Sequence, residues 1–242
     1  MENAPHIILA GRNLPMDIKE RYYKWNDAAY VPIYLNIPGY IELDYYEIVK
    51  KSLEYPESLN IHHAKNRHTF EESRKNQSRI DLQKDYDATF YRMVWLWHEV
   101  YYLIGSFSRD STSPEVTVIE NAPFIHFEGY RVPTSEQDKF DQWFMKWASH
   151  VYIPIILKSP SLKGCNCFKL SDLSMRWPGH KYLATEIPAC VFIFYFENAQ
   201  AFENYEESPE CAALKRSMEL ELPDDVKIIW NVEYQLAKSW RK

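Results

Sequence analysis

A stretch of fifteen residues occurs twice in this chain of 242 residues. Residues 24–38 read KWNDAAYVPIYLNIP and residues 146–160 read KWASHVYIPIILKSP, with seven identities at a constant offset of 122. Unrelated segments of this length would share about one residue. Because an internal repeat sets the architecture before any single element does, we predict two modules, residues 1–121 and 122–242.

The composition indicates a compact, aromatic-rich protein with an acidic balance. Aromatic residues make up 16% of the chain, the net charge is −6 and the pI is near 5.8. Non-specific nucleic-acid binding needs a concentrated basic face, which this chain lacks. No apolar run approaches the roughly 18 residues of a membrane span, and the first residues do not resemble a signal peptide. We therefore expect a cytoplasmic protein without nucleic-acid or membrane partners, and leave a homodimer open.

The second half is predicted to follow the order β-α-β-β-α-β, which is the ferredoxin-like plan. Its helices are expected after the first and third strands. Runs of aromatic and β-branched residues predict the strands, at residues 124–132, 163–170, 190–196 and 227–234.

The first half is predicted to have the same order, with strands at residues 7–12, 40–49 and 90–98. Its last strand is not placed. Residues 50–87 between the second and third strands are polar and charged, so we interpret them as an inserted, partly helical segment. We expect residues 60–77 to lie outside the core, at a pocket mouth or on an interface.

The repeated stretch lies at the end of a predicted amphipathic helix in each half. Trp25 and Trp147 belong to the apolar faces of these helices, and we expect both to be buried at equivalent positions. Pro32 and Pro154 cannot donate a backbone hydrogen bond, so each helix is predicted to kink or end there.

In each half a strand is followed by a Trp-bearing helix, a His/Tyr–Pro segment and a turn into the next strand. This order resembles the EthD-like branch of the dimeric α+β barrel superfamily. Members commonly place a histidine just before the proline of the helix. The second copy has only His150, which is imperfectly spaced from Pro154, and the first copy has Ala28 at that position. If that histidine is functional, only one of the two sites can be active. The residues that carry the resemblance are Trp25, Tyr30, Pro32, Pro38 and Gly39, repeated as Trp147, His150, Tyr152, Pro154 and Pro160.

The resemblance implies an α+β fold in which two tandem ferredoxin-like modules pair their sheets into a barrel within one chain. Members of the superfamily include polyketide cyclases and aromatases, cofactor-free monooxygenases, haem-handling enzymes and lactone isomerases. The fold alone does not choose among these activities.

Candidate catalytic residues lie in two places in the second half. Alternation along residues 124–132 puts His126, Glu128 and Tyr130 on one strand face, which we interpret as the inner, ligand-facing wall of the barrel. His126 oriented by Glu128, or His150 with Tyr152, is predicted to move a proton. A solvated or interface strand face, and a surface position for His150, are the alternatives.

Candidate substrate-binding residues come from polar and aromatic strand positions. Tyr130 shares the face of His126, and Asn231 and Glu233 share a face near the chain's end. Trp97 and His98 belong to an aromatic strand that either lines a substrate pocket or packs in the core.

Metal binding is not expected from the sequence. His62, His63 and His68 form an HHxxxxH string, but a metal site also needs oriented supporting ligands, which a polar loop does not guarantee. Lid chemistry or a metal remains the alternative for this string. The four cysteines lack a CxxC pair and are predicted to be reduced thiols, with a metal or redox site at Cys165 and Cys167 as the alternative.

These patterns favour a cofactor-independent enzyme that performs proton-transfer chemistry on a small hydrophobic molecule, aromatic or polyketide-like. Cyclisation, isomerisation and elimination all fit, so cyclase, isomerase and lyase activities stay open. The alternatives are a non-catalytic ligand-binding or interaction protein, and a haem-binding protein with His98, His126 or His150 as the axial ligand. No GxSxG, HExxH, P-loop or GxGxxG motif supports another enzyme class.

Overall fold

A computed structural model describes residues 2–50, 54–90, 92–109, 122–173, 176, 182–183 and 186–242. The predicted α+β class is confirmed, and the strands form a closed barrel in the order β1-β3-β2-β8-β5-β7-β6-β4. The chain divides into two compact units: residues 1–103, 170–185 and 237–242 form the first, and residues 104–169 and 186–236 the second. The proposed division of the chain after residue 121 stays a prediction.

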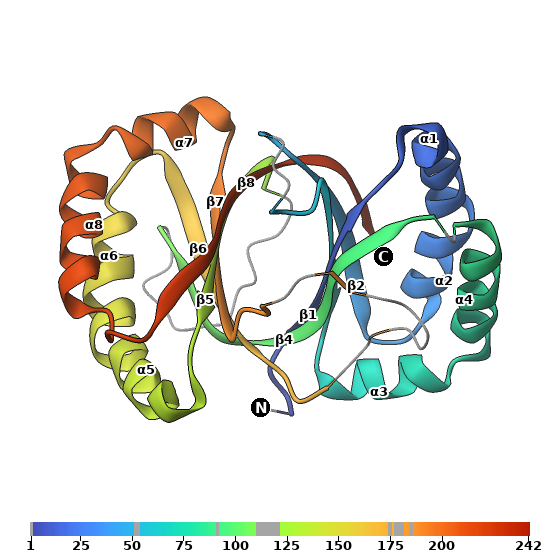
Figure 1. Cartoon of the computed structure of the whole chain (residues 1–242), viewed down its shortest axis with the longest axis horizontal. Coiled ribbons are helices and arrows are strands. Elements are labelled where there is room, and N and C mark those ends of the chain that lie inside the picture. The colour runs from blue at the N-terminus through green and yellow to red at the C-terminus, as the bar shows by residue number, and fades with distance from the viewer. Residues whose placement is uncertain are drawn as a thin grey trace. The chain divides into compact units, whose positions relative to one another are not determined.

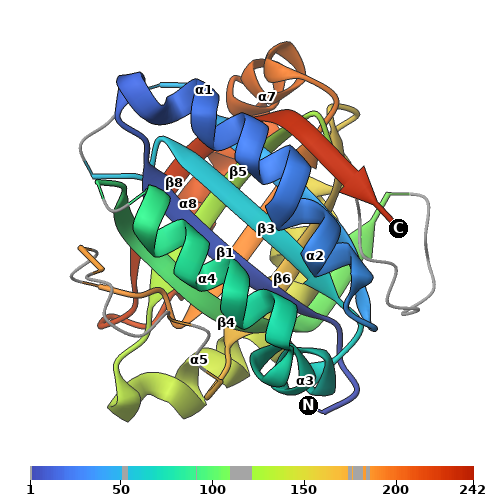
Figure 2. The same cartoon turned by 90° about the vertical axis from the view of Figure 1, so that its right-hand side faces the viewer.

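In the first unit, β3 lies between β1 and β2 and is antiparallel to both, while β1 also pairs with β4. Figure 2 shows α1, α2 and α4 crossing one face of this sheet. The elements of this half are β1 (His6–Asn13), α1 (Met16–Trp25), a π-helical segment (Asn26–Tyr30), α2 (Val31–Asn36), β2 (Tyr40–Ile48), β3 (Ser58–Ala64), α3 (Arg67–Lys75), α4 (Gln77–Thr89) and β4 (Val94–Ser108).

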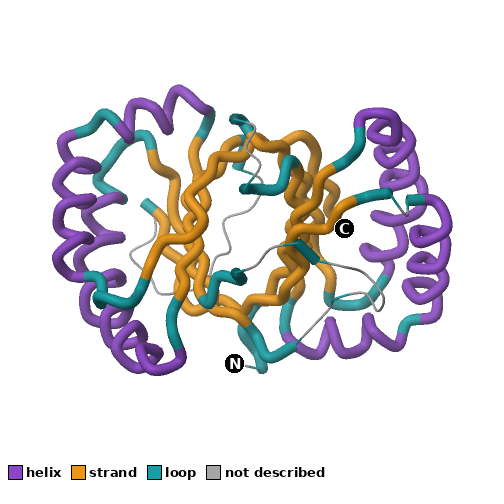
Figure 3. Tube along the Cα trace, in the orientation of Figure 1, coloured by secondary structure: helices purple, strands orange, loops and turns teal. Residues whose placement is uncertain are grey.

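In the second unit, β7 lies between β5 and β6, and β5 also pairs with β8, all antiparallel. Helices α5, α6 and α8 cover one face of this sheet, as the ribbon and the trace both show (Figures 1 and 3). The elements are β5 (Phe124–Arg131), a 3-10 turn (Thr134–Glu136), α5 (Gln137–Trp143), a π-helical segment (Phe144–Tyr152), α6 (Ile153–Ile156), β6 (Leu162–Leu170), β7 (Cys190–Phe196), α7 (Ala199–Glu206), α8 (Pro209–Glu221) and β8 (Lys227–Arg241).

Both copies of the repeated stretch pass through a π-helical segment and then a short α-helix. Pro32 and Pro154 each stand in the first turn of that short helix, directly after the π-helical segment. The helical stretch therefore does not end at either proline. A π-helical turn admits an extra residue into the helix, which re-aims the side chains on either side of it.

Trp25 and Trp147 are half-buried, so the prediction that both are buried is wrong. The Trp25 indole N–H donates to Asp85 at 2.6 Å, and a polar partner of this kind keeps the ring at the edge of the core. In each copy the indole contacts the tyrosine five residues on. The ring centroids are 5.6 Å apart for Trp25 and Tyr30, and 5.3 Å apart for Trp147 and Tyr152.

The segment expected to be an insertion contains β3, and all seven of its residues are buried. The prediction that residues 60–77 lie outside the core is therefore wrong for Asn60 to Ala64, and also for Phe70, which is buried in the core of this unit. The strand predicted at residues 90–98 is the start of β4, the last strand of this half. The error has a physical cause: β3 buries polar side chains, and His62, for example, makes a 3.1 Å hydrogen bond to the Tyr30 hydroxyl.

His62, His63 and His68 do not converge on one point. The rings of the first two leave β3 on opposite faces of the sheet, since they are adjacent in a strand. The His68 side chain is 73% exposed on α3.

Cys165, Cys167, Cys190 and Cys211 are buried free thiols. Among the described residues, no helix is long and apolar enough to cross a membrane.

Candidate active site

A cavity of about 370 Å³ lies within the second unit, between its sheet and its helices. Polar side chains reach it from β5 and β8, and apolar side chains from β7 and α8 line much of the rest. This combination of an apolar wall with a few convergent polar groups is typical of small-molecule sites. The lining residues are His126, Glu128, Tyr152, Phe194, Tyr205, Glu206, Cys211, Leu214, Lys215, Met218, Glu219, Leu222, Ile228 and Asn231.

Strand pairing brings the polar groups together. His126 and Glu128 are two residues apart on β5 and so share a face. The antiparallel register with β8 puts Glu233 opposite His126 and Asn231 opposite Glu128. The pairing thus brings together the two groups that alternation predicts separately, one on β5 and one on β8.

The face that carries His126 is turned toward the helices of its own unit. Tyr130 belongs to the same apolar cluster as Phe140 and Trp143 of α5, with ring centroids 6.1 Å from each. The interpretation of this face as the inner wall of a barrel is therefore wrong. Alternation could not predict which face of β5 points toward the helices, because the opposite face, with Ile125 and Phe127, is also apolar and buried.

The His126 ring lies between two carboxylates. Its Nε2 is 3.4 Å from Glu128 and its Nδ1 is 3.3 Å from Glu233, and the ring stacks on Phe202 at 5.0 Å. Burial lowers the pKa of His126, but the two carboxylates more than offset this and raise the pKa to about 9. His126 is thus an imidazolium at neutral pH, buried and already carrying a proton to donate.

Glu128 is positioned by a second donor. The Tyr130 hydroxyl donates a 2.6 Å hydrogen bond to its Oε2, while its Oε1 is the oxygen nearest His126. Burial raises the pKa of Tyr130 well above its ordinary value, and the Glu128 carboxylate raises it further. Tyr130 therefore stays protonated and holds the carboxylate in one orientation.

Tyr152 reaches the cavity from the π-helical segment, where its ring stacks on Trp147. Burial raises the pKa of its hydroxyl well above the ordinary value, again with a contribution from Glu128. The cavity therefore contains a neutral phenol, an imidazolium and a carboxylate within one apolar enclosure.

Three predicted site residues lie elsewhere. His150 is exposed and contacts the Ser149 hydroxyl at 2.8 Å, one residue before it in the chain. Trp97 and His98 are buried in the first unit, where Trp97 packs against Tyr101 and His98 stacks on Trp95. Their inclusion in one site with His126 is therefore wrong, whereas the roles of the remaining predicted residues stay predictions.

Several cavity residues were not predicted, and they come from α7 and α8. Lys215 forms a 2.8 Å ion pair with Glu206. The backbone N–H of Cys211 donates to the Ser208 hydroxyl, which caps α8. Their spacing could have revealed them. Cavity residues recur along α8 every three or four positions from residue 211 to residue 222, which is the period of one helix face.

The first unit lacks this constellation at the corresponding strand positions. The β1–β4 register shifts after Gly11 and the β5–β8 register shifts after Gly129, with the extra residue on β4 and on β8. The positions of His126, Glu128 and Tyr130 therefore correspond to Ile8, Ala10 and Arg12. The Arg12 guanidinium is buried and lies over the rings of Tyr22 and Trp95 at 5.1 and 4.7 Å.

Of the three histidines proposed as haem ligands, His126 does not fit that role. An axial ligand needs a ring nitrogen with a free lone pair. Both ring nitrogens of His126 face carboxylates, and its pKa of about 9 keeps them protonated at neutral pH. His150 lies outside the cavity, and the His98 ring is stacked on Trp95 in the first unit.

No protein-family model matches the chain, and no curated protein matches its sequence. Solved structures do match its fold. A putative monooxygenase from Fusobacterium nucleatum aligns over 100% of this chain and 96% of its own, with a TM-score of 0.60 and 11% identity. An anthrone oxidase-like protein aligns over 99% and 94%, with a TM-score of 0.61 and 13% identity.

A putative chlorite dismutase also aligns over 97% of this chain and 95% of its own, with a TM-score of 0.59 and 10% identity. At these identities the likeness shows the fold alone. The chain thus has the fold of the dimeric α+β barrel proteins, on which unlike activities occur.

Proposed function

We propose that the cavity of the second unit is an active site for cofactor-independent proton transfer on a small hydrophobic molecule. The observation that carries the proposal is the buried His126 imidazolium held between Glu128 and Glu233. Titratable groups whose environments separate an acid from a base mark acid–base sites. The apolar wall and the cavity volume favour a flat, aromatic or polyketide-like substrate.

In the proposed reaction His126 and Glu128 have complementary tasks. The Glu128 carboxylate takes a proton from a carbon next to a substrate carbonyl, and His126 gives its proton to the carbonyl oxygen. The product is an enol, with neutral imidazole and protonated Glu128 left behind. Return of a proton at another carbon completes an isomerisation, and attack of the enol carbon on a second carbonyl closes a ring. Each general acid or base contributes typically ~10²–10⁴-fold in rate.

Anthrone is a suitable probe, because it is a tricyclic ketone whose methylene group exchanges through an enol. One solved structure of this fold is described as anthrone oxidase-like, which motivates the choice. Exchange of the methylene protons in D₂O is followed by NMR with and without the protein. The wild-type protein is expected to accelerate exchange, and His126→Gln to lose ~10²-fold or more of that acceleration.

His150→Ala serves as the matched control, since this histidine is exposed and does not line the cavity. It is expected to keep the wild-type exchange rate. Equal losses in both variants would remove the proposed role of His126. Saturable binding of anthrone without accelerated exchange would favour the non-catalytic ligand-binding alternative.

We also infer that the two halves arose by tandem duplication and that the repeated helix places the chain near the EthD-like branch. Both halves run β-α-β-β-α-β, with π-helical segments in the repeated stretch. A second offset, 132, relates the later elements: Asn66 caps α3 through the backbone N–H of Thr69, and Asn198 caps α7 through that of Ala201. Shared irregular details of this kind support a common origin.

A further inference from the structure

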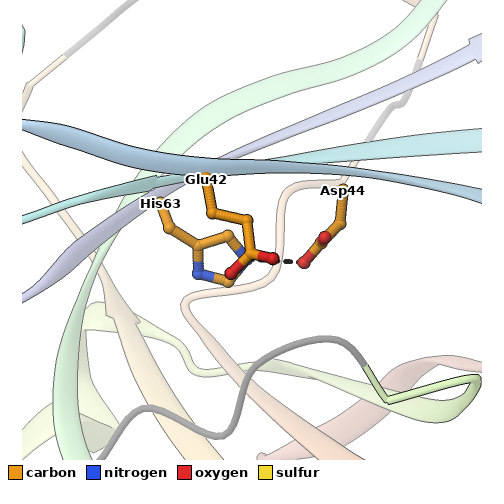
Figure 4. Close-up of side chains that lie close together, drawn as sticks. All are labelled: Glu42, Asp44 and His63. Atoms are coloured by element: carbon orange, nitrogen blue, oxygen red, sulfur yellow. Dashed lines mark hydrogen bonds and ion pairs between the residues drawn. The ribbon is translucent and has the colours of Figure 1, made fainter. Parts of the chain in front are cut away.

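A second group of ionisable side chains lies in the first unit, away from the cavity just described. Glu42 and Asp44 are two residues apart on β2, and the register with β3 puts His63 opposite Glu42. Figure 4 shows the three side chains pointing toward one another. Their neighbours Leu43 and His62 face the helices of this unit, so the group occupies the opposite face of the sheet.

The three side chains are buried and close. Glu42, Asp44 and His63 are 0%, 2% and 5% exposed, and one ligand atom from each lies within 4.8 Å of the others. His63 Nε2 is 2.9 Å from Asp44 Oδ2. The Ser239 hydroxyl and the Arg241 guanidinium donate to Glu42 at 2.8 and 3.1 Å.

Asp44 carries the observation that points to a ligand. Its Oδ1 is buried and has no hydrogen-bond partner within the part of the chain that the structure describes. Leaving a buried carboxylate oxygen without a partner is costly, and such groups are normally paired or coordinate a metal.

The second unit shows which side chains a strand pair of this kind needs at the positions of Glu42, Asp44 and His63. The β6–β7 pairing has the same register and the same irregularity as β2–β3, and it places Gly164 opposite Tyr195, with Asn166 two residues on. There the Asn166 amide donates to the Tyr195 hydroxyl at 3.1 Å. A neutral hydrogen bond therefore suffices for the fold, and the carboxylates and imidazole of the first unit are additional.

We propose that Glu42, Asp44 and His63 form a binding site for a divalent transition-metal ion. Two carboxylates and an imidazole suit Mn²⁺, Fe²⁺ or Zn²⁺, whereas Mg²⁺ and Ca²⁺ prefer oxygen alone. Ser239 and Arg241 orient Glu42 as outer partners of a ligand do. Three protein ligands leave further coordination positions for water or a substrate oxygen. Binding requires neutral His63, so affinity falls at acidic pH.

The test uses the full chain after removal of metals with EDTA. Calorimetric titration with Zn²⁺ and Mn²⁺, and visible absorption with Co²⁺, are expected to show one equivalent bound by the wild-type protein. The double variant Asp44→Asn/His63→Tyr copies the neutral pair of the second unit, so it is expected to fold. Its affinity for the metal is expected to fall at least ~100-fold.

Two controls separate this site from other ligands. His68→Ala removes an exposed histidine and His126→Gln alters the cavity of the second unit, and both are expected to keep the bound equivalent. Glu42→Gln provides a second loss variant should the double variant fail to fold. The proposal is overturned if the wild-type protein binds none of the three metals stoichiometrically, or if the loss variants bind as tightly as wild type.

Discussion

At the scale of single residues, the charge on His126 is the property from which the site's chemistry follows. A histidine buried alone would lose its proton, because burial disfavours the charged form. Glu128 and Glu233 reverse this outcome from two sides of the ring. The same residue that would otherwise act as a base is thereby an acid at neutral pH, and Glu128 is left as the base.

This charge predicts a pH-dependent stability. The folded-state pKa of about 9 lies above the ordinary value of 6.5, so the stabilisation from His126 is fully present below about pH 6.5. It is lost as the pH rises through about 9 and amounts to about 3 kcal/mol. Urea unfolding of wild type and His126→Gln from pH 6 to pH 10 measures the difference, which should shrink over that range. Parallel profiles would contradict the assigned charge.

The hydrogen bond from Tyr130 to Glu128 predicts a second effect. Tyr130→Phe keeps the ring but removes the 2.6 Å donor, and bonds to charged groups contribute about 1.5–3 kcal/mol. Tyr152→Phe is the matched control, because no hydrogen bond of its hydroxyl is found among the described residues. Denaturant unfolding should show a loss for Tyr130→Phe and little change for the control. Equal losses would mean that the bond does not position Glu128.

At the scale of elements, most strands could be predicted, because their aromatic and β-branched runs are distinct from the surrounding turns. The predicted strand at residues 190–196 matches β7 in its bounds. The strand β3 was missed because its buried face carries Asn60, His62 and other polar groups rather than an apolar run. Their hydrogen bonds come from distant elements, such as Tyr30, and no local pattern reveals such partners.

The repeat itself contained the missing signal. A single offset of 122 covers the first helix and the second strand of each half, but the third strand and the helices after it follow an offset of 132, and the last strand follows 133. At that second offset Ile61, Asn66 and Phe70 match Ile193, Asn198 and Phe202. Comparison at both offsets would have identified β3 and the cap of α3 from the sequence.

Strand alternation predicted one part of the site, whereas the other part depends on how the helices pack on the sheet. Alternation grouped His126 with Glu128, and placed Asn231 with Glu233, because side chains alternate strictly along a strand. The contribution of α8 depends on how that helix packs over the sheet, which the sequence pattern of β5 does not contain. His150 was predicted to belong to the site because the family it resembles places a histidine near the proline of this helix, but in the π-helical segment its side chain is exposed.

At the scale of the whole molecule, the two units use one plan for different chemistry. The second unit places an imidazolium and a carboxylate on the face toward its helices, where the first has Ile8 and Ala10. The first unit places Glu42, Asp44 and His63 on the opposite face, where the second has a neutral amide–phenol pair. Two units with the same order of elements can differ in this way, because the elements keep the core while single strand positions change.

The common plan makes a prediction about two glycines. A Cβ at Gly11 would lie 2.6 Å from Cγ of Pro56, and one at Gly129 would lie 2.7 Å from Cγ of Pro188. Both glycines lie directly before the register shift between the first and last strands of their half, and a proline ring cannot turn away as a flexible side chain can. Gly11→Ala and Gly129→Ala should therefore each lower the unfolding free energy by about 1–3 kcal/mol.

Double variants test whether the contact with proline is the cause. Adding Pro56→Ala to Gly11→Ala, or Pro188→Ala to Gly129→Ala, removes the ring atom that lies nearest and should restore part of the lost stability. Denaturant unfolding of the single and double variants gives a coupling free energy for each pair, of the same sign in both halves. If the halves share their close-packed bulge by descent, both cycles show coupling. Coupling in one half alone would argue that the bulges arose separately and would weaken the case for duplication.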